Sequence, residues 1–178
     1  MAVRKIVKYG QPILRQKTNP VTEFDDEIRH LAEDMVETMH EAEGIGLAAP
    51  QVGESKALCV VNLELIDETA EPKAYINPKI VADDGTSTLE EGCLSIPDIR
   101  EDITRPESIT VKYQDINGEE HEEQCVGMLA RVLQHEIDHL NGILFIDRIS
   151  PMRRKLLSKK LKKIASESSF EAPVSTSG

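Results

Sequence analysis

Residues 134–142 read Gln134-His135-Glu136-Ile137-Asp138-His139-Leu140-Asn141-Gly142, and the rest of the chain can be interpreted outward from this stretch. It contains a His-Glu-x-x-His pattern inside a segment, Val126 to Asn141, whose apolar residues have helical spacing. Residues four apart on a helix return to nearly the same face. His135 and His139 can therefore direct two imidazoles at one metal ion, with Glu136 placed to reach a water on that ion. The competing interpretation is two ordinary histidines on a polar helix face.

A catalytic metal site of this kind needs a third protein ligand and one open position. The other histidines lie in polar stretches and are interpreted as surface residues: His30, His40 and His121. Cys59 falls in an apolar run typical of a protein core, and Cys125 borders the helix. Cys93 follows Gly92, and a glycine lets the backbone approach a ligand closely. We therefore predict that Cys93 completes the ligand set.

Composition limits the class of protein. The 178 residues are enough for one domain with a hydrophobic core. The net charge of −11 argues against general binding to nucleic acid, DNA included. No hydrophobic signal segment or membrane-length apolar run is present, and we expect no membrane association. Three cysteines without a Cys-x-x-Cys pair predict free thiols or thiolate ligands in the reducing cytoplasm.

The C-terminal part differs in charge from the rest of the chain. Ser150 and Pro151 predict the start of a helix that ends near Ala165. Its apolar side is predicted from four residues: Leu156, Leu157, Leu161 and Ile164. The segment 151–165 carries seven basic residues and no acidic one: Arg153, Arg154, Lys155, Lys159, Lys160, Lys162 and Lys163. Residues 166–178 are rich in Ser, Thr and Pro, so we expect a single domain over 1–165 followed by a disordered tail.

Patterning elsewhere predicts an α+β fold. A helix is expected from Glu23 to Glu43, with Thr22 as N-cap and Gly44 as its stop. Strands or extended segments are expected at 57–63, 74–81, 89–99, 108–114, 119–125 and 143–146. Pro78 indicates an edge or irregular position, and Asn117-Gly118 a tight hairpin turn. We expect antiparallel sheets packed around the His-Glu-x-x-His helix, with one further helix at each end of the chain.

Three motifs resemble the signature motifs of the peptide deformylases, in the same order and at similar spacings. They are Gly44-Ile45-Gly46-Leu47-Ala48-Ala49-Pro50-Gln51, Glu91-Gly92-Cys93-Leu94-Ser95 and Gln134-His135-Glu136-Ile137-Asp138-His139. The resemblance covers about residues 3–165, and the basic C-terminal helix is similar to that of bacterial type I enzymes. It implies a metal-dependent hydrolase that removes the formyl group from the N-terminal formyl-methionine of newly synthesised polypeptides.

The resemblance also implies roles for individual residues. The ligand set Cys93, His135 and His139 would hold one divalent ion, natively Fe(II), with Ni, Co or Zn as substitutes. Glu136 would act as general base. The side-chain amide of Gln51 and the backbone N–H of Leu94 would stabilise the developing oxyanion.

Small residues are expected to leave room for a peptide beside the metal: Gly44, Gly46 and Gly92. The resemblance implies that the substrate binds as an added strand, along the main chain near Ile45, Gly46 and Gly92. Candidates for an apolar methionine pocket are Ile45, Ile96, Val132 and His135. Arg131 is expected at the edge of this pocket.

Charged neighbours of the motifs are expected to support the metal ligands. Glu91 and Arg105 can form an ion pair, and Asp138 can orient a ligand histidine, although each can equally be a solvated charge. Through the same resemblance, we expect the basic segment 151–165 to dock on ribosomal RNA near the peptide exit tunnel. The alternative is a solvated helix that packs its apolar side on the body.

Two other functions remain open from the residues. A zincin-type peptidase would take its third ligand downstream of the second histidine, whereas Cys93 lies upstream. A non-catalytic ribosome- or RNA-binding module would close its structural metal site with a fourth Cys or His, and no clear fourth ligand is present.

Overall fold

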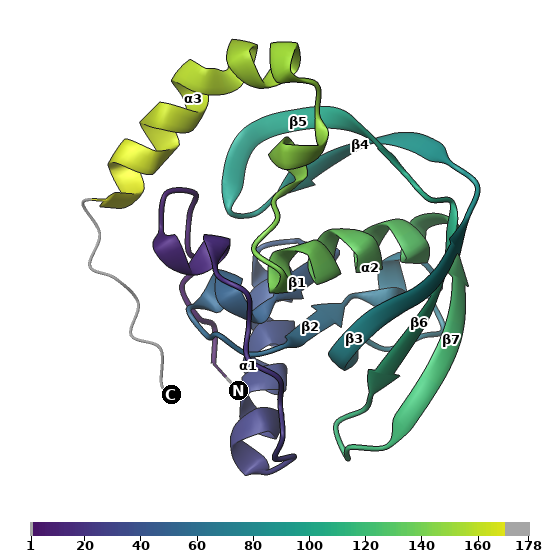
Figure 1. The fold of residues 1–178 in the computed structure, drawn as a ribbon. Helices are drawn as coiled ribbons and strands as arrows, with labels where there is room; N and C mark the ends of the chain where they lie inside the picture. The colour runs from purple at the N-terminus through teal and green to yellow at the C-terminus, as the bar shows by residue number, and fades with distance from the viewer. Residues whose placement is uncertain (1, 170–178) are drawn as a thin grey trace.

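Two antiparallel sheets and three α-helices make up residues 2–169, the part of the chain that the computed structural model describes (Figure 1). The five-stranded sheet has the order β1 (Gly46–Ala48), β2 (Leu58–Val61), β3 (Lys73–Asp84), β6 (Ser108–Gln114) and β7 (Glu120–Val126). The two-stranded sheet is a hairpin of β4 (Ser87–Cys93) and β5 (Ile96–Arg105). The helices are α1 (Asp26–Glu41), α2 (Gly127–Leu140) and α3 (Pro151–Ser169). The expected α+β class is therefore confirmed.

Strand β2 explains how the helices are held. Its four residues are all buried, because successive side chains point to opposite faces and both faces are covered. Cys59 and Val61 pack in the core beneath α2, whereas Leu58 and Val60 pack in the core formed with α1. The sheet thus separates two apolar cores, one formed with α2 and the other with α1.

Helix α2 lies between the five-stranded sheet and the β4–β5 hairpin (Figure 1). All of its residues from Ala130 to Leu140 are buried, which places its polar side chains in the interior. The helix ends at Leu140, and Gly142 two residues later has a φ of +75°, which suits a glycine. A Cβ atom there would also lie 2.6 Å from the carbonyl oxygen of Arg15.

A third core joins the hairpin to the C-terminal part of the chain. Ile96, Ile99 and Ile103 of β5 pack against the 3₁₀ helix Phe145–Arg148 and against Leu157 and Leu161 of α3. Figure 1 shows α3 curving over this end of the molecule. Within residues 2–169, no helix combines the length and apolar character that crossing a bilayer requires.

Several expected boundaries and turns were wrong. The N-cap of α1 is Asp25 and not Thr22. The side chain of Asp25 accepts a hydrogen bond from the N–H of Ile28, and its negative charge interacts favourably with the positive end of the helix dipole. For Pro78, by contrast, the expectation of an edge or irregular position is confirmed in its second form, since β3 lies in the middle of its sheet but is irregular there. Its irregularity is a register shift between Ile76 and Lys79, around Asn77 with φ of 51°.

Other differences concern the hairpin and the C-terminal region. Residues 115–119 form a loop between β6 and β7 that is longer than a two-residue turn, and in it only Gly118 has positive φ. The segment expected as a strand at 143–146 instead enters the 3₁₀ helix Phe145–Arg148. Helix α3 continues past Ala165 to Ser169, so 166–169 are helical. Residues 170–178 of the expected tail lie outside the described residues.

The predicted cap of α3 is confirmed, but one of its expected core residues is not buried. The hydroxyl of Ser150 accepts a hydrogen bond from the N–H of Arg153 at 3.2 Å. Leu157 and Leu161 are buried in the core with β5, whereas Leu156 is 67% exposed and lies outside that core.

Candidate metal centre

The three predicted ligands converge at one point between α2 and the β4–β5 hairpin. Helical spacing brings His135 and His139 to the same face of α2, with ring centroids 5.0 Å apart. Cys93 is the last residue of β4, and its Sγ lies 3.3 Å from Nε2 of His139. One donor atom from each residue lies within 4.8 Å of the other two. These three side chains therefore form a metal site of the predicted composition.

The imidazole of His135 is oriented by a buried carboxylate. Its Nδ1 lies 2.9 Å from Oε1 of Glu91, so a proton on Nδ1 leaves Nε2 to bind a metal. Glu91 is in turn held by Arg105, whose Nε and Nη2 donate at 2.6 and 2.9 Å, and by Arg131. Burial raises the pKa of Glu91, but hydrogen bonds from His135 and Arg105 outweigh it and lower that pKa to about 2.

Of the charged residues expected to support the metal ligands, Asp138 and Arg131 make contacts that were not expected. The Glu91–Arg105 pair is present, whereas Asp138 accepts a hydrogen bond from Arg105 at 2.9 Å and does not touch a ligand histidine directly. Arg131 lines the cleft as expected, but its guanidinium also binds Glu91 and the carbonyl of Ile103. Its charge is thus used to hold the carboxylate behind the metal ligands.

The second histidine is in the form that binds metals. Burial lowers the pKa of His139 well below its ordinary value, so its imidazole is neutral near pH 7. Its Nδ1 is buried and has no hydrogen-bond partner among the described residues. A donor set of one thiol and two imidazoles suits a divalent transition metal, and the arrangement fits such an ion.

Glu136 lies beside the ligands on the same helix. Its side chain is buried against Gly46, where an added Cβ atom would meet Oε2 at 2.6 Å. Burial raises the pKa of Glu136 to about 7, and Oε1 has no partner among the described residues. A buried, unpartnered carboxylate oxygen next to three metal donors can accept a proton from a bound molecule.

The amide of Gln51 also points at the centre. Its Nε2 lies 3.6 Å from Sγ of Cys93 and 3.1 Å from Oγ of Ser95. Its Oε1 accepts a hydrogen bond from the N–H of Ala48 at 2.9 Å, which fixes the NH₂ group toward the thiol. Ser95 was not predicted as a site residue, although it belongs to the same motif as Cys93. It is fully buried and connects Gln51 to the hairpin turn.

An open cleft of about 740 Å³ leads to the metal site. All predicted substrate-binding residues line it: Gly44, Ile45, Gly46 and Gly92. Leu94 and the methionine-pocket candidates line it as well: Ile45, Ile96, Val132 and His135. The cleft also contains Lys8, whose ammonium donates to the carbonyl of Leu94 at 3.1 Å. Lys8 carries no sequence signal, because it comes from the N-terminal arm, far from every motif.

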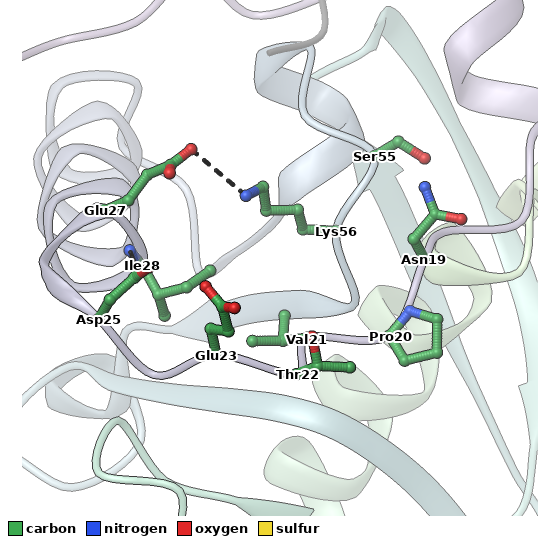
Figure 2. Close-up of a pocket in the computed structure, with 10 residues that line it drawn as sticks. All are labelled: Asn19, Pro20, Val21, Thr22, Glu23, Asp25, Glu27, Ile28, Ser55 and Lys56. Atoms are coloured by element: carbon green, nitrogen blue, oxygen red, sulfur yellow. Dashed lines mark hydrogen bonds and ion pairs between the residues drawn. The ribbon is translucent and has the colours of Figure 1, made fainter. Parts of the chain in front are cut away.

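A second hollow, of about 340 Å³, lies beside the start of α1 (Figure 2). Its lining contains three carboxylates and one cation, Lys56, which pairs with Glu27 at 3.5 Å. Asp25 in this lining is used as the cap of α1. Among the residues that line this hollow there is no Cys or His.

The fold and the site together define a class, the metal-dependent hydrolases with a His-Glu-x-x-His helix and a cysteine as third ligand. A family model for polypeptide deformylase matches residues 3–155. Peptide deformylase from Acidobacterium capsulatum is 49% identical over 164 residues, covering 92% of this chain and 96% of the relative. Peptide deformylase from Brucella suis is 47% identical over 168 residues, covering 94% and 96%. The chain belongs to the polypeptide deformylase family.

Solved structures agree with this assignment. A crystal structure of a peptide deformylase from Legionella pneumophila has a TM-score of 0.85 and 40% identity, covering 96% of this chain and 100% of that one. The crystal structure of peptide deformylase from Thermus thermophilus has a TM-score of 0.86 and 42% identity, covering 93% and 99%. The protein is thus an enzyme, a hydrolase that removes N-formyl groups from peptides.

Proposed function

We propose that residues 1–165 act as one catalytic domain that deformylates the N-terminal formyl-methionine of newly synthesised polypeptides. The observation that carries the proposal is the position of Glu136, whose unpartnered carboxylate oxygen lies beside Cys93, His135 and His139. Formyl is the smallest acyl group, and a metal centre enclosed by Glu136 and Gln51 favours it over larger ones.

The metal would be held by the thiolate of Cys93 and by the two histidines. When bound, a divalent ion supplies Lewis acidity, which lowers the pKa of water toward neutrality and polarises the formyl carbonyl. We infer Fe(II) as the native ion, with Ni, Co or Zn as substitutes. The inference is supported by the thiolate ligand and by the family resemblance, and metal analysis of anaerobically purified protein tests it.

In the proposed mechanism, Glu136 accepts a proton from the attacking water at its buried carboxylate and later passes it to the departing amine. The Nε2 of Gln51 and the backbone N–H of Leu94 donate to the oxygen of the formyl group as negative charge develops there. The hydrogen bond from Ala48 to Oε1 of Gln51 supports this role, because it keeps the amide oxygen away from the developing charge.

The peptide is proposed to bind as an extra strand between β1 and β4. Strand β1 is at the edge of its sheet, and β4 pairs only with β5, so each has an edge without a strand partner among the described residues. Gly46 of β1 and Gly92 of β4 line the cleft and offer main-chain groups. The methionine is proposed to contact the pocket candidates that line the same cleft: Ile45, Ile96, Val132 and His135.

Helix α3 is proposed to dock on ribosomal RNA near the exit tunnel. Five of its lysines are exposed: Lys155, Lys159, Lys160, Lys162 and Lys163. Arg153 and Arg154 instead pair with Glu101 and Asp147 of the body. A cytoplasmic location, which nascent chains require, is supported by the free thiols of all three cysteines.

The decisive experiment compares hydrolysis of formyl-Met-Ala-Ser with that of acetyl-Met-Ala-Ser by the iron-loaded protein. We expect release of formate and no release of acetate. Equal activity on both, or none on either, would refute the proposal. Cleavage of peptide bonds in unformylated peptides would instead support a zincin-type peptidase, which the origin of the third ligand in β4 disfavours.

A further inference from the structure

A continuous chain of charged side chains leads from the metal site to the surface. It starts at His135, whose Nδ1 contacts Glu91, and passes to the buried guanidinium of Arg105. Nη1 of Arg105 then donates to Oδ2 of Asp138 at 2.9 Å. The chain ends at Arg148, whose Nε and Nη2 donate to the two oxygens of Asp138 at 2.6 and 2.8 Å.

The exposed fraction of the side chains increases along this series of contacts. The side chain of Arg105 is 3% exposed, that of Asp138 is 12% exposed and that of Arg148 is 41% exposed. Arg148 ends the 3₁₀ helix that precedes α3, whereas Asp138 lies on α2 directly before His139. The two-pronged contact between them therefore ties the base of the C-terminal region to the helix turn that carries a metal ligand.

We propose that Arg148 is a positioning residue for the metal centre, acting through Asp138, Arg105 and Glu91 on His135. Arg105 bridges two carboxylates, because its Nε and Nη2 donate to Glu91 while its Nη1 donates to Asp138. When Arg148 is removed, Oδ1 of Asp138 loses its side-chain partner and the carboxylate can rotate. Arg105 and Glu91 then follow, and Nε2 of His135 is no longer held toward the metal.

A positioning role and a simple electrostatic effect of Arg148 predict changes of opposite sign in metal affinity when the residue is replaced. Loss of a positive charge near a cation site strengthens cation binding through Coulomb's law. Loss of a positioning residue weakens cation binding, because a ligand that must be oriented costs conformational entropy when the metal binds. The sign of the change in metal affinity therefore separates the two effects.

The test measures Zn²⁺ affinity by competition with a chromophoric chelator, without any substrate. For Arg148→Met we expect the dissociation constant to rise about 10- to 100-fold. Arg148→Lys keeps the charge but lacks the planar fork, so we expect a rise of about 3- to 10-fold. The matched control is Arg153→Met, because Arg153 makes a similar two-pronged contact with buried Glu101 but has no link to α2. It should stay within about twofold of wild type.

A double-mutant cycle tests the route. In an Asp138→Asn background, Arg148→Met should change the Zn²⁺ affinity by no more than about twofold, because the carboxylate that links Arg148 to Arg105 is already lost. Tighter or unchanged binding in Arg148→Met overturns the proposal, as does an equal loss in Arg153→Met. If Arg148→Met does not fold, wild-type affinity in Arg148→Lys overturns it equally. Because no deformylation is measured, the result is independent of the proposed function.

Discussion

The backbone of Gly46 lies directly against the carboxylate of Glu136, so that a Cβ atom at position 46 would stand 2.6 Å from Oε2. Gly46→Ala should therefore displace the proposed base. We expect kcat to fall about 10²-fold, as for a displacement of about 1 Å, with metal content unchanged. Gly44→Ala is the control, because the nearest atom to a Cβ there is Cδ1 of the flexible Leu94 side chain, at 2.8 Å, and Glu136 is not among its near neighbours. An equal loss in both variants would point to substrate binding instead.

Glu136→Gln tests proton transfer itself. The amide keeps the shape of the side chain but cannot accept a proton from water, so turnover should fall by about 10²–10⁴-fold. Metal content, measured by elemental analysis, should match that of the wild type, because Glu136 is outside the donor set. Loss of metal together with activity would show that this carboxylate has a structural role.

Gln51→Leu removes the proposed oxyanion donor. We expect kcat to fall about 10²–10³-fold with little change in KM, because the hydrogen bond strengthens as charge develops. Ser95→Ala is the matched control, since it removes the contact at 3.1 Å with Gln51 but leaves the amide donor in place. A Ser95→Ala loss as large as that of Gln51→Leu would mean that Gln51 acts only by packing the hairpin turn.

Asp147 should make stability depend on pH. Burial raises its pKa, but hydrogen bonds from Arg15, Leu144 N–H and Arg154 outweigh it and lower that pKa below the ordinary 3.8. A carboxyl whose pKa is lowered on folding stabilises the protein above its unfolded pKa, and this stabilisation is lost as pH falls through the folded pKa. Asp147→Asn should cost about 1–2 kcal/mol at pH 7, after allowance for solvent screening.

Urea unfolding at pH 7, 5 and 3 checks this expectation. The difference between Asp147→Asn and wild type should be constant from pH 7 to 5 and shrink at pH 3. Asp102→Asn, at an exposed position on β5, is the control for the loss of one carboxylate from the surface. A difference for Asp147→Asn that stays constant down to pH 3 would show that hydrogen bonding of an uncharged group suffices.

The lysines of α3 should control ribosome binding. Reversing three exposed lysines together, Lys155, Lys159 and Lys162 to Glu, should abolish co-sedimentation with ribosomes at low salt, and wild-type binding should weaken steeply as salt rises. Hydrolysis of a free formyl-peptide should be unchanged. The control reverses three exposed lysines elsewhere, Lys17, Lys79 and Lys112. Equal loss in both triple variants would indicate a general charge effect.

Local patterns in the sequence were sufficient to predict the donor set. The spacing of His135 and His139 is a property of any helix, and the helix was predicted from apolar periodicity. Cys93 could be chosen because Gly92 precedes it and because the other cysteines border or enter apolar runs. Glu136 was indicated by its place beside His135, and Gln51 by the resemblance to the deformylase motifs; both line the cleft with Cys93 and His135.

The parts that could not be predicted depend on long-range contacts. Nothing near Arg148 in the sequence indicates that its partner is Asp138, and Lys8 reaches the cleft only through the path of the N-terminal arm. The segment 143–146 is apolar enough for a strand, yet it packs under β5 and α3 as an irregular stretch leading into a 3₁₀ helix. Asp25 replaces Thr22 as cap because helix ends are set by single hydrogen bonds.

The position of Cys93 at the end of a hairpin has a thermodynamic consequence. Strands β5, β6 and β7 separate it from the histidines along the chain, so the donors meet only after the hairpin has packed on α2. An ion that needs all three donors therefore binds the native state far more tightly than the unfolded chain. By mass action, the metal adds to the free energy of unfolding in proportion to the logarithm of its free concentration. The bound ion would thereby also link the β4–β5 hairpin to α2 in the native state.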